Sequence, residues 1–438
     1  MKYLIIACLV FWSLLLHAQV KPYTFEECVE YALENGTDIK RSQNNLELQE
    51  AYLNQSKASR LPNLQLGVNQ QFEKTSIYDN STGTWGKNDY TSLNASIGSK
   101  MTIYNGGKIK NLINQSKNNA ESAQYSLVAA KEQISLEVLS AFIDVLYAKE
   151  NLQNKRLQLE ESEKQYEYAK AKYEAGTLSR TDFLNVKSQV ATDKTNLAEA
   201  ESNYRMMLVS LMQVINMPVQ DDFTIVQPDV DSIVSQNITT NPEDVYSIAL
   251  EQQPNIKAAA LNLKSAEVGV EIAKAQALPN LSLSAGLGTS FNSEFSAVDF
   301  GNQLTNRINP YVGISLSIPV FQQKQAKTSV KVARIQSKDI ALELMEIKNN
   351  LRKSIEQACS SYQTAQTNFM ALQEALEAEQ ESYNLASEKF AQGMVNSFDL
   401  LLSKNNLVKI RNKFIQAKYN LVLQKKIIEY YLGEQIKL

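Results

Sequence analysis

Four short segments of the chain alternate apolar and polar residues with a period of two, as β-strands with one apolar face do. The first pair lies over about 64–73 and 92–104, and the second pair over about 281–291 and 311–321. Each segment is about ten residues long, which is enough to cross a bilayer when a strand is tilted. The pattern predicts four amphipathic strands, two in each half of the chain.

A half-buried sheet in a soluble domain would show the same alternation. Two features favour membrane strands instead. The connections 76–91 and 292–310 are long and polar, as external loops are, and aromatic residues gather near the strand ends, as they do at membrane interfaces. We therefore interpret the strands as membrane-spanning, with the two connections outside the cell.

Two long stretches between and after the strand pairs favour helix. Between Gly107 and Pro218 the only glycine is Gly176, and between Pro319 and Gly433 the only glycine is Gly393. A helix over 108–174 would be about 100 Å long at 1.5 Å per residue, which requires a bundle or coiled coil. The sequence predicts two long helical hairpins with their tips at 176–181 and 393–398.

The two halves of the chain are related by an internal repeat. The segment Leu61-Pro62-Asn63-Leu64 recurs 217 residues later as Leu278-Pro279-Asn280-Leu281, and the same displacement carries Gly176 onto Gly393. The unit is much longer than a solenoid repeat, so it indicates duplication of a half-molecule. We predict a first repeat over 19–216, a linker over 217–241 that contributes to a belt around the helices, and a second repeat over 242–438.

The N-terminus has the pattern of a cleavable secretory signal over residues 1–18, with Lys2 before an apolar run and Ala18 at its end. No later segment approaches the ~20 apolar residues of a membrane-spanning helix, so membrane contact would come through the strands or a surface helix. Without residues 1–18 the chain has 43 basic and 47 acidic residues, a net charge of −4 with both signs interspersed. Nucleic acid is not expected as a partner.

Histidine, the commonest general base, is missing from the mature chain. The single histidine of the full sequence, His17, lies in the predicted signal, which excludes histidine-based triads and histidine metal sites. A secreted hydrolase using carboxylates alone is a further alternative, but no clustered acid pair stands out. We predict no catalytic residue, metal or cofactor, and we expect Cys28 and Cys359 to be unrelated thiols rather than a disulfide.

The four predicted strands imply an oligomer. An open sheet edge in lipid would leave backbone groups without hydrogen-bond partners, so the strands of one chain must be completed by other copies. Two copies would give eight strands with a filled interior, whereas three give twelve and leave room for a lumen. We therefore expect a homotrimer with threefold symmetry whose strands contact membrane lipid.

The order of these features resembles the TolC family of outer-membrane efflux proteins. The resemblance covers nearly the whole mature chain and rests on the opening segment 23–33, the paired Leu-Pro-Asn-Leu segments, and hairpin tips with Tyr173 before Gly176 and Phe390 before Gly393. It implies an α+β membrane protein in which a trimeric twelve-stranded β-barrel continues as a helical tunnel across the periplasm of a Gram-negative bacterium. Such a channel-tunnel conducts cargo passively, and its partners would be a periplasmic adaptor and an inner-membrane pump of the RND or ABC type.

The hairpin tips are the candidate functional sites. Each glycine can end a helix in the left-handed conformation, and Ser179 or Asn396 can cap the helix that follows. If the tips form the periplasmic mouth of the tunnel, exposed residues on them would contact the adaptor. The expected contact residues are Gly176, Thr177, Leu178, Ser179, Arg180, Gly393, Met394, Val395, Asn396 and Ser397.

Asp399 and Asp182 are the candidate residues of a periplasmic aperture. The resemblance places Asp399 at an entrance constriction, where threefold symmetry would form a ring of carboxylates facing cations. The next acidic position of that pattern is Leu402 here, which argues against a second acidic ring. Both aspartates also stand three residues after a capping residue, so a role in capping alone explains them equally well.

A periplasmic adaptor or a structural coiled coil of the cell envelope is the alternative function. Either would share the signal peptide and the long paired helices, but neither requires four amphipathic strands or duplication of the whole chain. The sequence contains no feature that selects the transported substrate, the pump, or an open or closed resting state.

Overall fold

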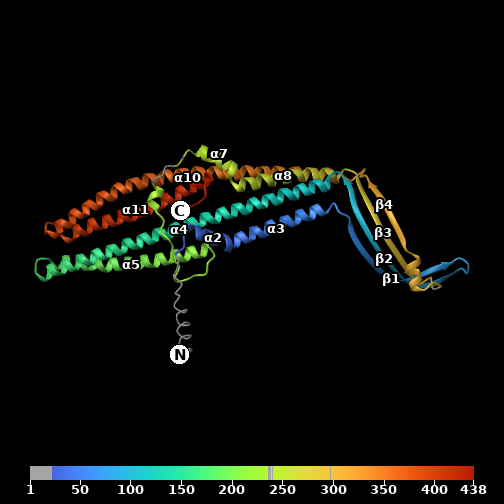
Figure 1. Cartoon of the computed structure of the whole chain (residues 1–438), viewed down its shortest axis with the longest axis horizontal. Coiled ribbons are helices and arrows are strands. Elements are labelled where there is room, and N and C mark those ends of the chain that lie inside the picture. Colours follow the sequence, from blue (N-terminus) through green and yellow to red (C-terminus); the bar gives the residue numbers. More distant parts are fainter. Residues whose placement is uncertain (1–21, 235–237, 239, 296) are drawn as a thin grey trace, which may run out of the picture. The chain divides into compact units, whose positions relative to one another are not determined.

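The computed structural model describes residues 22–234, 238, 240–295 and 297–438, and Figure 1 shows it as a cartoon. The predicted signal peptide lies outside the described residues. The chain is mostly helical, with one antiparallel sheet. Its described residues divide into two compact units, one within 22–44, 125–257 and 346–438, and the other within 45–124 and 258–345. Among the described residues, no helix combines the length and apolarity that a membrane crossing requires.

The internal repeat is present in the helix boundaries. Each helix of the first half has a counterpart of the same length that starts 217 residues later, which is the displacement of the sequence motifs. The pairs are α2 (Phe25–Asn35) with α7 (Pro242–Gln252), α3 (Thr37–Ala58) with α8 (Pro254–Ala275), α4 (Lys108–Glu174) with α10 (Gln325–Ala391), and α5 (Arg180–Val214) with α11 (Ser397–Tyr431). A short helix without a counterpart, α6 (Val230–Val234), lies in the linker.

The second unit contains the sheet. Its strands β1 (Asn63–Asp79), β2 (Thr84–Asn105), β3 (Asn280–Asn292) and β4 (Asn309–Ser317) pair antiparallel in the order β1-β2-β3-β4. The strands of the two repeats therefore meet between β2 and β3. The outer strands β1 and β4 each have one edge that pairs with no other strand of the described chain.

The two faces of the sheet differ in chemistry, as the alternation predicts. The register aligns Leu66 of β1 with Ile97 of β2, and Ile97 with Leu287 of β3. On the opposite face Gln65 aligns with Gly98, Gly98 with Gly286, and Gly286 with Tyr311. One face is thus lined mainly by aliphatic side chains, and the other by amides, hydroxyls and glycines, with the Tyr311 ring covering Gly286.

The first strand pair extends further than the sequence indicates. Strands expected over 64–73 and 92–104 continue on both sides of the turn, pairing up to Asp79 and Thr84, so the expected loop 76–91 is wrong. The connection is the short turn 80–83, in which Gly83 has a φ of +66° and its amide donates to the Asp79 carbonyl at 2.8 Å. The sequence does not predict this extension because its residues are mostly polar. A two-stranded ribbon in contact with water on both faces does not need the apolar face that period-two alternation reveals.

The second strand pair differs at its ends. β4 ends at Ser317 instead of residue 321, because Pro319 has no amide hydrogen for the ladder and lies just beyond the last pair, Asn280 with Ser317. The connection before β4 contains a short helix, α9 (Phe300–Asn306). Buried Gln303 holds this connection in shape, since its side-chain amide donates to the carbonyls of Asn292, Phe295 and Val298 at 2.9–3.2 Å.

The first unit packs around two main clusters of buried apolar side chains and a small one near the hairpin tips. In the larger main cluster the rings of Phe25 on α2 and Phe142 on α4 pack edge to face with their centroids 5.7 Å apart, and Cys28 of the same cluster is fully buried. Cys359 of α10 lies in the other main cluster. Both cysteines are free thiols, which confirms the expectation that they do not form a disulfide.

The linker helix α6 is anchored to the first unit through α11. The buried ammonium group of Lys425 donates to the carbonyl of Ile233 at 2.6 Å, at the C-terminal end of α6 where carbonyls lack helical partners. Val230 and Ile233 pack into the larger apolar cluster. The part of the linker that is described therefore lies against the helical bundle.

Candidate functional site at the helical hairpin tips

The two hairpin tips have the same backbone construction. Gly176 and Gly393 both have a φ of +74°, and no atom lies within 4 Å of the position a Cβ would take at either. The amide of the next residue bonds back to the helix in each case, Thr177 to the Lys172 carbonyl and Met394 to the Lys389 carbonyl, both at 2.9 Å. This is a Schellman motif, so backbone conformation and not crowding requires glycine here.

The residues that follow each glycine cap the next helix. The hydroxyl oxygen of Ser179 accepts from the amide of Asp182 at 3.1 Å, and the side-chain oxygen of Asn396 accepts from the amide of Asp399 at 2.9 Å. Both are the N-cap contacts that the sequence predicts. The carboxylates of Asp182 and Asp399, however, differ in what they contact.

Asp182 links the two tips to each other. One carboxylate oxygen accepts from the Ser179 hydroxyl at 2.6 Å within its own tip, while the other accepts from the amide and the hydroxyl of Ser397 at 3.1 and 2.5 Å. Ser397 is fully buried and also receives a hydrogen bond from Asn185 at 3.3 Å. Hydrogen bonds from Ser179 and Ser397 lower the pKa of the Asp182 carboxyl.

Asp399 has the opposite environment. Its side chain is exposed, and no described residue forms a hydrogen bond or ion pair with its carboxylate. Its neighbour Phe398 is also exposed, and Leu402 lies one turn further along the same helix. Within one chain, therefore, Asp182 is engaged in a structural contact and Asp399 is not.

Three of the expected adaptor-contacting residues are less accessible than the sequence suggests, and one of them, Ser397, is fully buried. Leu178 and Val395 are half-buried because both pack against a small cluster formed by Tyr383, Phe390 and Leu400. Arg180 is exposed, and Met394 is 69% exposed. The accessible side chains of the tips are thus Thr177, Ser179, Arg180, Met394 and Asn396.

The last turns of the two hairpins are joined just above the tips. The carbonyl of Ala391, at the end of α10, accepts from the Tyr168 hydroxyl at 3.1 Å and from the Lys172 ammonium at 2.9 Å. A cation at a helix C-terminus pairs a carbonyl that has no helical partner and complements the helix dipole. Together with Asp182 and Ser397, these contacts hold the two tips side by side.

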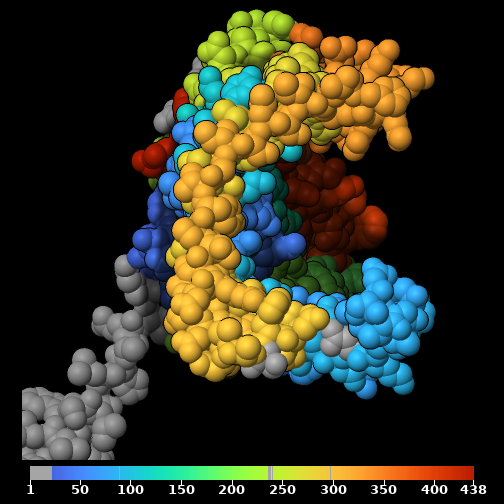
Figure 2. Space-filling model, turned by 90° about the vertical axis from the view of Figure 1, so that its right-hand side faces the viewer, coloured from blue at the N-terminus to red at the C-terminus, as the bar shows by residue number. Residues whose placement is uncertain are grey.

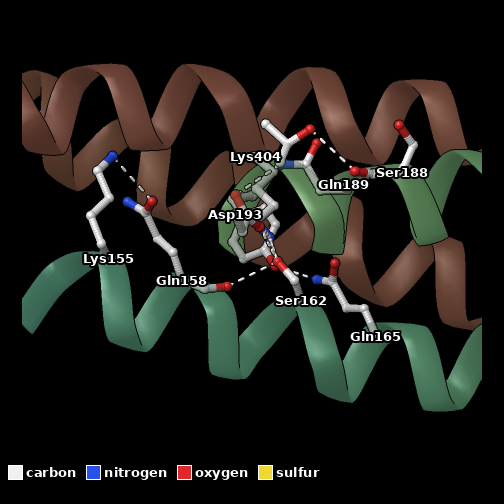
Figure 3. Close-up of polar contacts among 10 residues, drawn as sticks. Lys155, Gln158, Ser162, Gln165, Ser188, Gln189, Asp193 and Lys404 are labelled. Atoms are coloured by element: carbon white, nitrogen blue, oxygen red, sulfur yellow. Dashed lines mark hydrogen bonds and ion pairs between the residues drawn. The ribbon is translucent and has the colours of Figure 1, made fainter. Parts of the chain in front are cut away.

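Further along the bundle, a buried ion pair crosses between the hairpins (Figure 3). The ammonium of Lys404 on α11 is 2% exposed and lies 3.2 Å from a carboxylate oxygen of Asp193 on α5 and 2.5 Å from the hydroxyl of Ser162 on α4. Ser162 also donates to that same oxygen of Asp193. Burial lowers the pKa of nearby Lys155, and the charge of Asp193 opposes this shift.

Sequence reasoning did not find this ion pair, although a signal for it exists. Asp193 lies midway between Val186 and Ala200 at seven-residue spacing, and all three are buried on α5. Lys404 similarly lies between Leu400 and Leu407 on the buried side of α11. An isolated charge at a core position of a long helix, with one of opposite sign on the paired helix, is the pattern to search for.

Neither the tips nor the described remainder of the chain contains a group of three or more His, Cys, Asp or Glu that could hold a metal ion. The polar groups at the tips act through hydrogen bonds and charge instead. The carboxylates of the tips can bind cations and repel anions, and the Schellman turns fix the positions of these carboxylates.

Comparison with known proteins identifies the family. The model of the family described as outer membrane efflux protein matches residues 28–217 and 245–434, once in each repeat. The chain belongs to the outer membrane efflux protein family. It is therefore an outer-membrane transport protein, a component of the kind found in tripartite efflux systems, and not an enzyme. The two matches confirm the internal repeat, and the family favours a channel over the alternative of a periplasmic adaptor.

Individual members of this family are distant in sequence but close in fold. The efflux protein BepC of Brucella suis is 21% identical over 316 residues, which cover 70% of this chain and 66% of BepC. TolC of Escherichia coli is 21% identical over 394 residues, covering 87% of this chain and 76% of TolC, which confirms the resemblance to TolC. The crystal structure of CusC superposes with a TM-score of 0.81 at 15% identity and covers 94% of this chain and 92% of CusC.

Proposed function

We propose that three copies of this chain form a channel that conducts cargo passively from a periplasmic adaptor and an inner-membrane pump to the outside of the cell. The observation that carries this proposal is the sheet, which has one aliphatic face and unpaired edges at β1 and β4. In lipid both edges need partners. Pairing of β1 in one copy with β4 in the next satisfies them in a closed ring of twelve strands.

The chemistry of the two faces sets the orientation of the sheet in this barrel. The face with Leu66, Ile97 and Leu287 would contact lipid, and the face with Gln65, Asn69 and Asn94 would line a water-filled lumen. Tyr311 lies on the lumen face, above Gly98 and Gly286. The long hairpins of α4 with α5 and α10 with α11 would then form the wall of a tunnel in the periplasm.

The tips are the part of the chain proposed to meet the adaptor. Their two Schellman turns are held side by side by Asp182, Ser397 and the Ala391 carbonyl, so they present a defined surface. Arg180 and Met394 are its most prominent side chains, one cationic and one apolar and adaptable. The pump behind such an adaptor would be of the RND or ABC type.

We assign the aperture role to Asp399 and a linking role to Asp182. Both carboxylate oxygens of Asp182 accept hydrogen bonds within the chain. Asp399 takes part in capping only through its backbone amide, and its carboxylate is exposed. A carboxylate that must act on passing ions has to be accessible. Only Asp399 meets that condition.

Inter-subunit cross-linking tests the proposed barrel directly. Gln65→Cys on β1 would be combined in turn with Gly313→Cys and Ser315→Cys on β4, which share the lumen face with it. Oxidation should yield covalent trimers in at least one combination. The control replaces the β1 cysteine by Asn94→Cys on the interior strand β2, which should give none. A protein that stays monomeric in detergent and never cross-links would contradict the proposal.

A further inference from the structure

The hairpin of β1 and β2 continues beyond the rest of the sheet as a two-stranded ribbon, residues 72–91. β2 pairs with β3 only from Ser92 onward, while its pairing with β1 extends to Thr84. Figure 1 shows the blue hairpin passing the ends of β3 and β4, and in Figure 2 it stands out as a lobe of its own. The twelve-stranded barrel proposed above does not require this extension, because the ribbon lies beyond the part of the sheet in which all strands pair.

The ribbon has two faces of different charge. Period-two alternation places Lys74 and Tyr78 of β1 on the same face as the apolar side chains Leu66, Val68 and Phe72. Their cross-strand partners are Asp89 and Trp85. This outer face also carries Lys87, so it has two cations and one anion. The opposite face carries Glu73 and Asp79 and no cation.

The outer face ends in an exposed aromatic pair. The rings of Tyr78 and Trp85 lie 5.3 Å apart, and Trp85 is 71% exposed. Lys74 contacts Asp89 at 3.5 Å, which leaves Lys87 as the cation without a carboxylate partner among the described residues. A large exposed aromatic surface beside a cation is typical of a binding surface and not of a solvated loop.

The aromatic pair lies too far along the strand to be part of the membrane girdle. Six residues separate Phe72 from Tyr78, which corresponds to about 20 Å of strand. Girdle aromatics adjoin the apolar band directly, as Phe72 does here. Between Phe72 and the pair lie only the polar rows Lys74 with Asp89 and Ser76 with Lys87. In the proposed barrel the pair would face outward beyond the girdle, at a height that only the sugars of a large lipid head group reach.

We propose that the outer face of this ribbon binds the phosphorylated sugar head groups of the lipids around the barrel. The flat rings of Trp85 and Tyr78 would stack on the apolar C–H faces of sugar rings, and Lys87 would pair with a phosphate. The ligand is placed at the lipid because this face continues the apolar face of β1. The ligand is expected to be negatively charged because this face carries more cations than anions. The inference rests on the proposed orientation of the barrel.

Trp85 provides its own probe for this site. The chain has two tryptophans, and the other, Trp12, lies in the predicted signal peptide, so emission from the mature protein reports Trp85 alone. The trimer would be placed in lipid nanodiscs containing phosphatidylethanolamine alone, phosphatidylglycerol, or lipopolysaccharide. A shift of emission to shorter wavelength with reduced quenching by acrylamide is expected only with lipopolysaccharide.

Variants test the phosphate contact of Lys87 and the sugar contact of Trp85 one at a time. Lys87→Gln should reduce the lipopolysaccharide retained per trimer after washing several-fold, and so should Trp85→Ala. Lys100→Gln, which removes a cation near the other end of β2, should leave retention unchanged. Equal shifts with phosphatidylglycerol, a shift already present in detergent alone, or no shift at all would overturn the proposal.

The same preparations show whether a failure lies in the ribbon or in the barrel. A heat-dissociable trimer that conducts ions but has an insensitive Trp85 would overturn this inference while leaving the proposed function intact. Loss of trimer and conductance in the unmodified protein would instead contradict the proposed function.

Discussion

The carboxylate of Asp182 accepts hydrogen bonds from both the amide and the hydroxyl of Ser397, although the two residues belong to different repeats. Ser397 is the first residue of α11, and Asp182 is in the first turn of α5. A carboxylate at a helix N-terminus is favoured by the helix dipole, and here it serves two helix starts at once. The contact joins the tips of two hairpins that have no covalent connection nearby.

The first prediction is that Asp182→Ala loosens the paired tips. Charge-assisted hydrogen bonds are worth about 1.5–3 kcal/mol, and partial exposure of this carboxylate reduces that to about 1 kcal/mol. Spin labels at Thr177→Cys and Met394→Cys should show a broader distance distribution in the variant. Asp399→Ala is the matched control and should leave the distribution narrow. If both variants broaden it equally, the Asp182 contact is not what holds the tips together.

The lowered pKa of Asp182 adds a pH dependence to this contact. Folding favours the carboxylate, so its contribution is fully present above the ordinary carboxyl pKa of about 3.9 and is lost as pH falls through the lowered native value. The same spin-label distribution should therefore broaden only in strongly acidic solution. In Asp182→Ala that acid-dependent step should be absent.

A second prediction concerns the buried pair of Lys404 and Asp193. Lys404→Met leaves a carboxylate buried without its cation, which typically costs about 3–5 kcal/mol. The double variant Lys404→Met with Asp193→Leu removes both charges and should recover most of that loss. Ser162 keeps an acceptor in either case, since the Gln158 carbonyl lies 2.9 Å from its hydroxyl and can accept the proton when Asp193 is replaced.

Thermal unfolding followed by circular dichroism measures both effects. The control is Lys164→Met, which breaks the exposed pair of Lys164 with Glu160 on the same bundle and should leave the unfolding temperature almost unchanged. If Lys404→Met is as stable as this control, the buried pair of Lys404 and Asp193 does not contribute to the stability of the bundle.

The third prediction tests the contact between Gly286 and Tyr311 in the sheet. A Cβ at Gly286 would lie 2.7 Å from the Ile97 carbonyl oxygen and 2.8 Å from the Tyr311 ring, so Gly286→Ala must displace backbone or ring. Overpacking of this kind typically costs about 1–3 kcal/mol. Gly288→Ala is the control, because its nearest neighbour would be 3.9 Å away.

The temperature at which the trimer dissociates on gels would report both glycine variants. We expect a lower temperature for Gly286→Ala and little change for Gly288→Ala. Tyr311→Ser in the Gly286→Ala background should restore part of the lost dissociation temperature. The part that is not restored comes from the contact of the added Cβ with the Ile97 carbonyl oxygen.

The elements predicted from the sequence are those whose pattern is local. The helical hairpins follow from the absence of proline and from single glycines at 176 and 393, and both glycines have the positive φ that a Schellman turn requires. The ribbon 72–91 was missed because polar residues predominate on both faces of its strands and interrupt the period-two pattern. The pairing of Asp182 with Ser397 depends on packing between repeats, which single-sequence patterns do not contain.

The final prediction separates the two roles that the sequence allows for Asp399. Its amide is capped by Asn396 at 2.9 Å, and this backbone contact survives in Asp399→Asn while the charge is removed. The carboxylate itself has no partner in the described chain, so the variant should change thermal stability by less than about 0.5 kcal/mol. If three copies of the carboxylate surround the aperture, however, they concentrate cations there, and the effect is largest at low ionic strength.

Single-channel recording in planar bilayers distinguishes the outcomes. Asp399→Asn should keep the trimer intact while it reduces cation preference and weakens block by divalent cations, with the difference shrinking as salt is raised. Asp182→Asn is the matched control and should leave selectivity unchanged, because that carboxylate is engaged with Ser179 and Ser397. If Asp399→Asn alters neither selectivity nor block, the Asp399 carboxylate has no role at the aperture, and its assignment there is wrong.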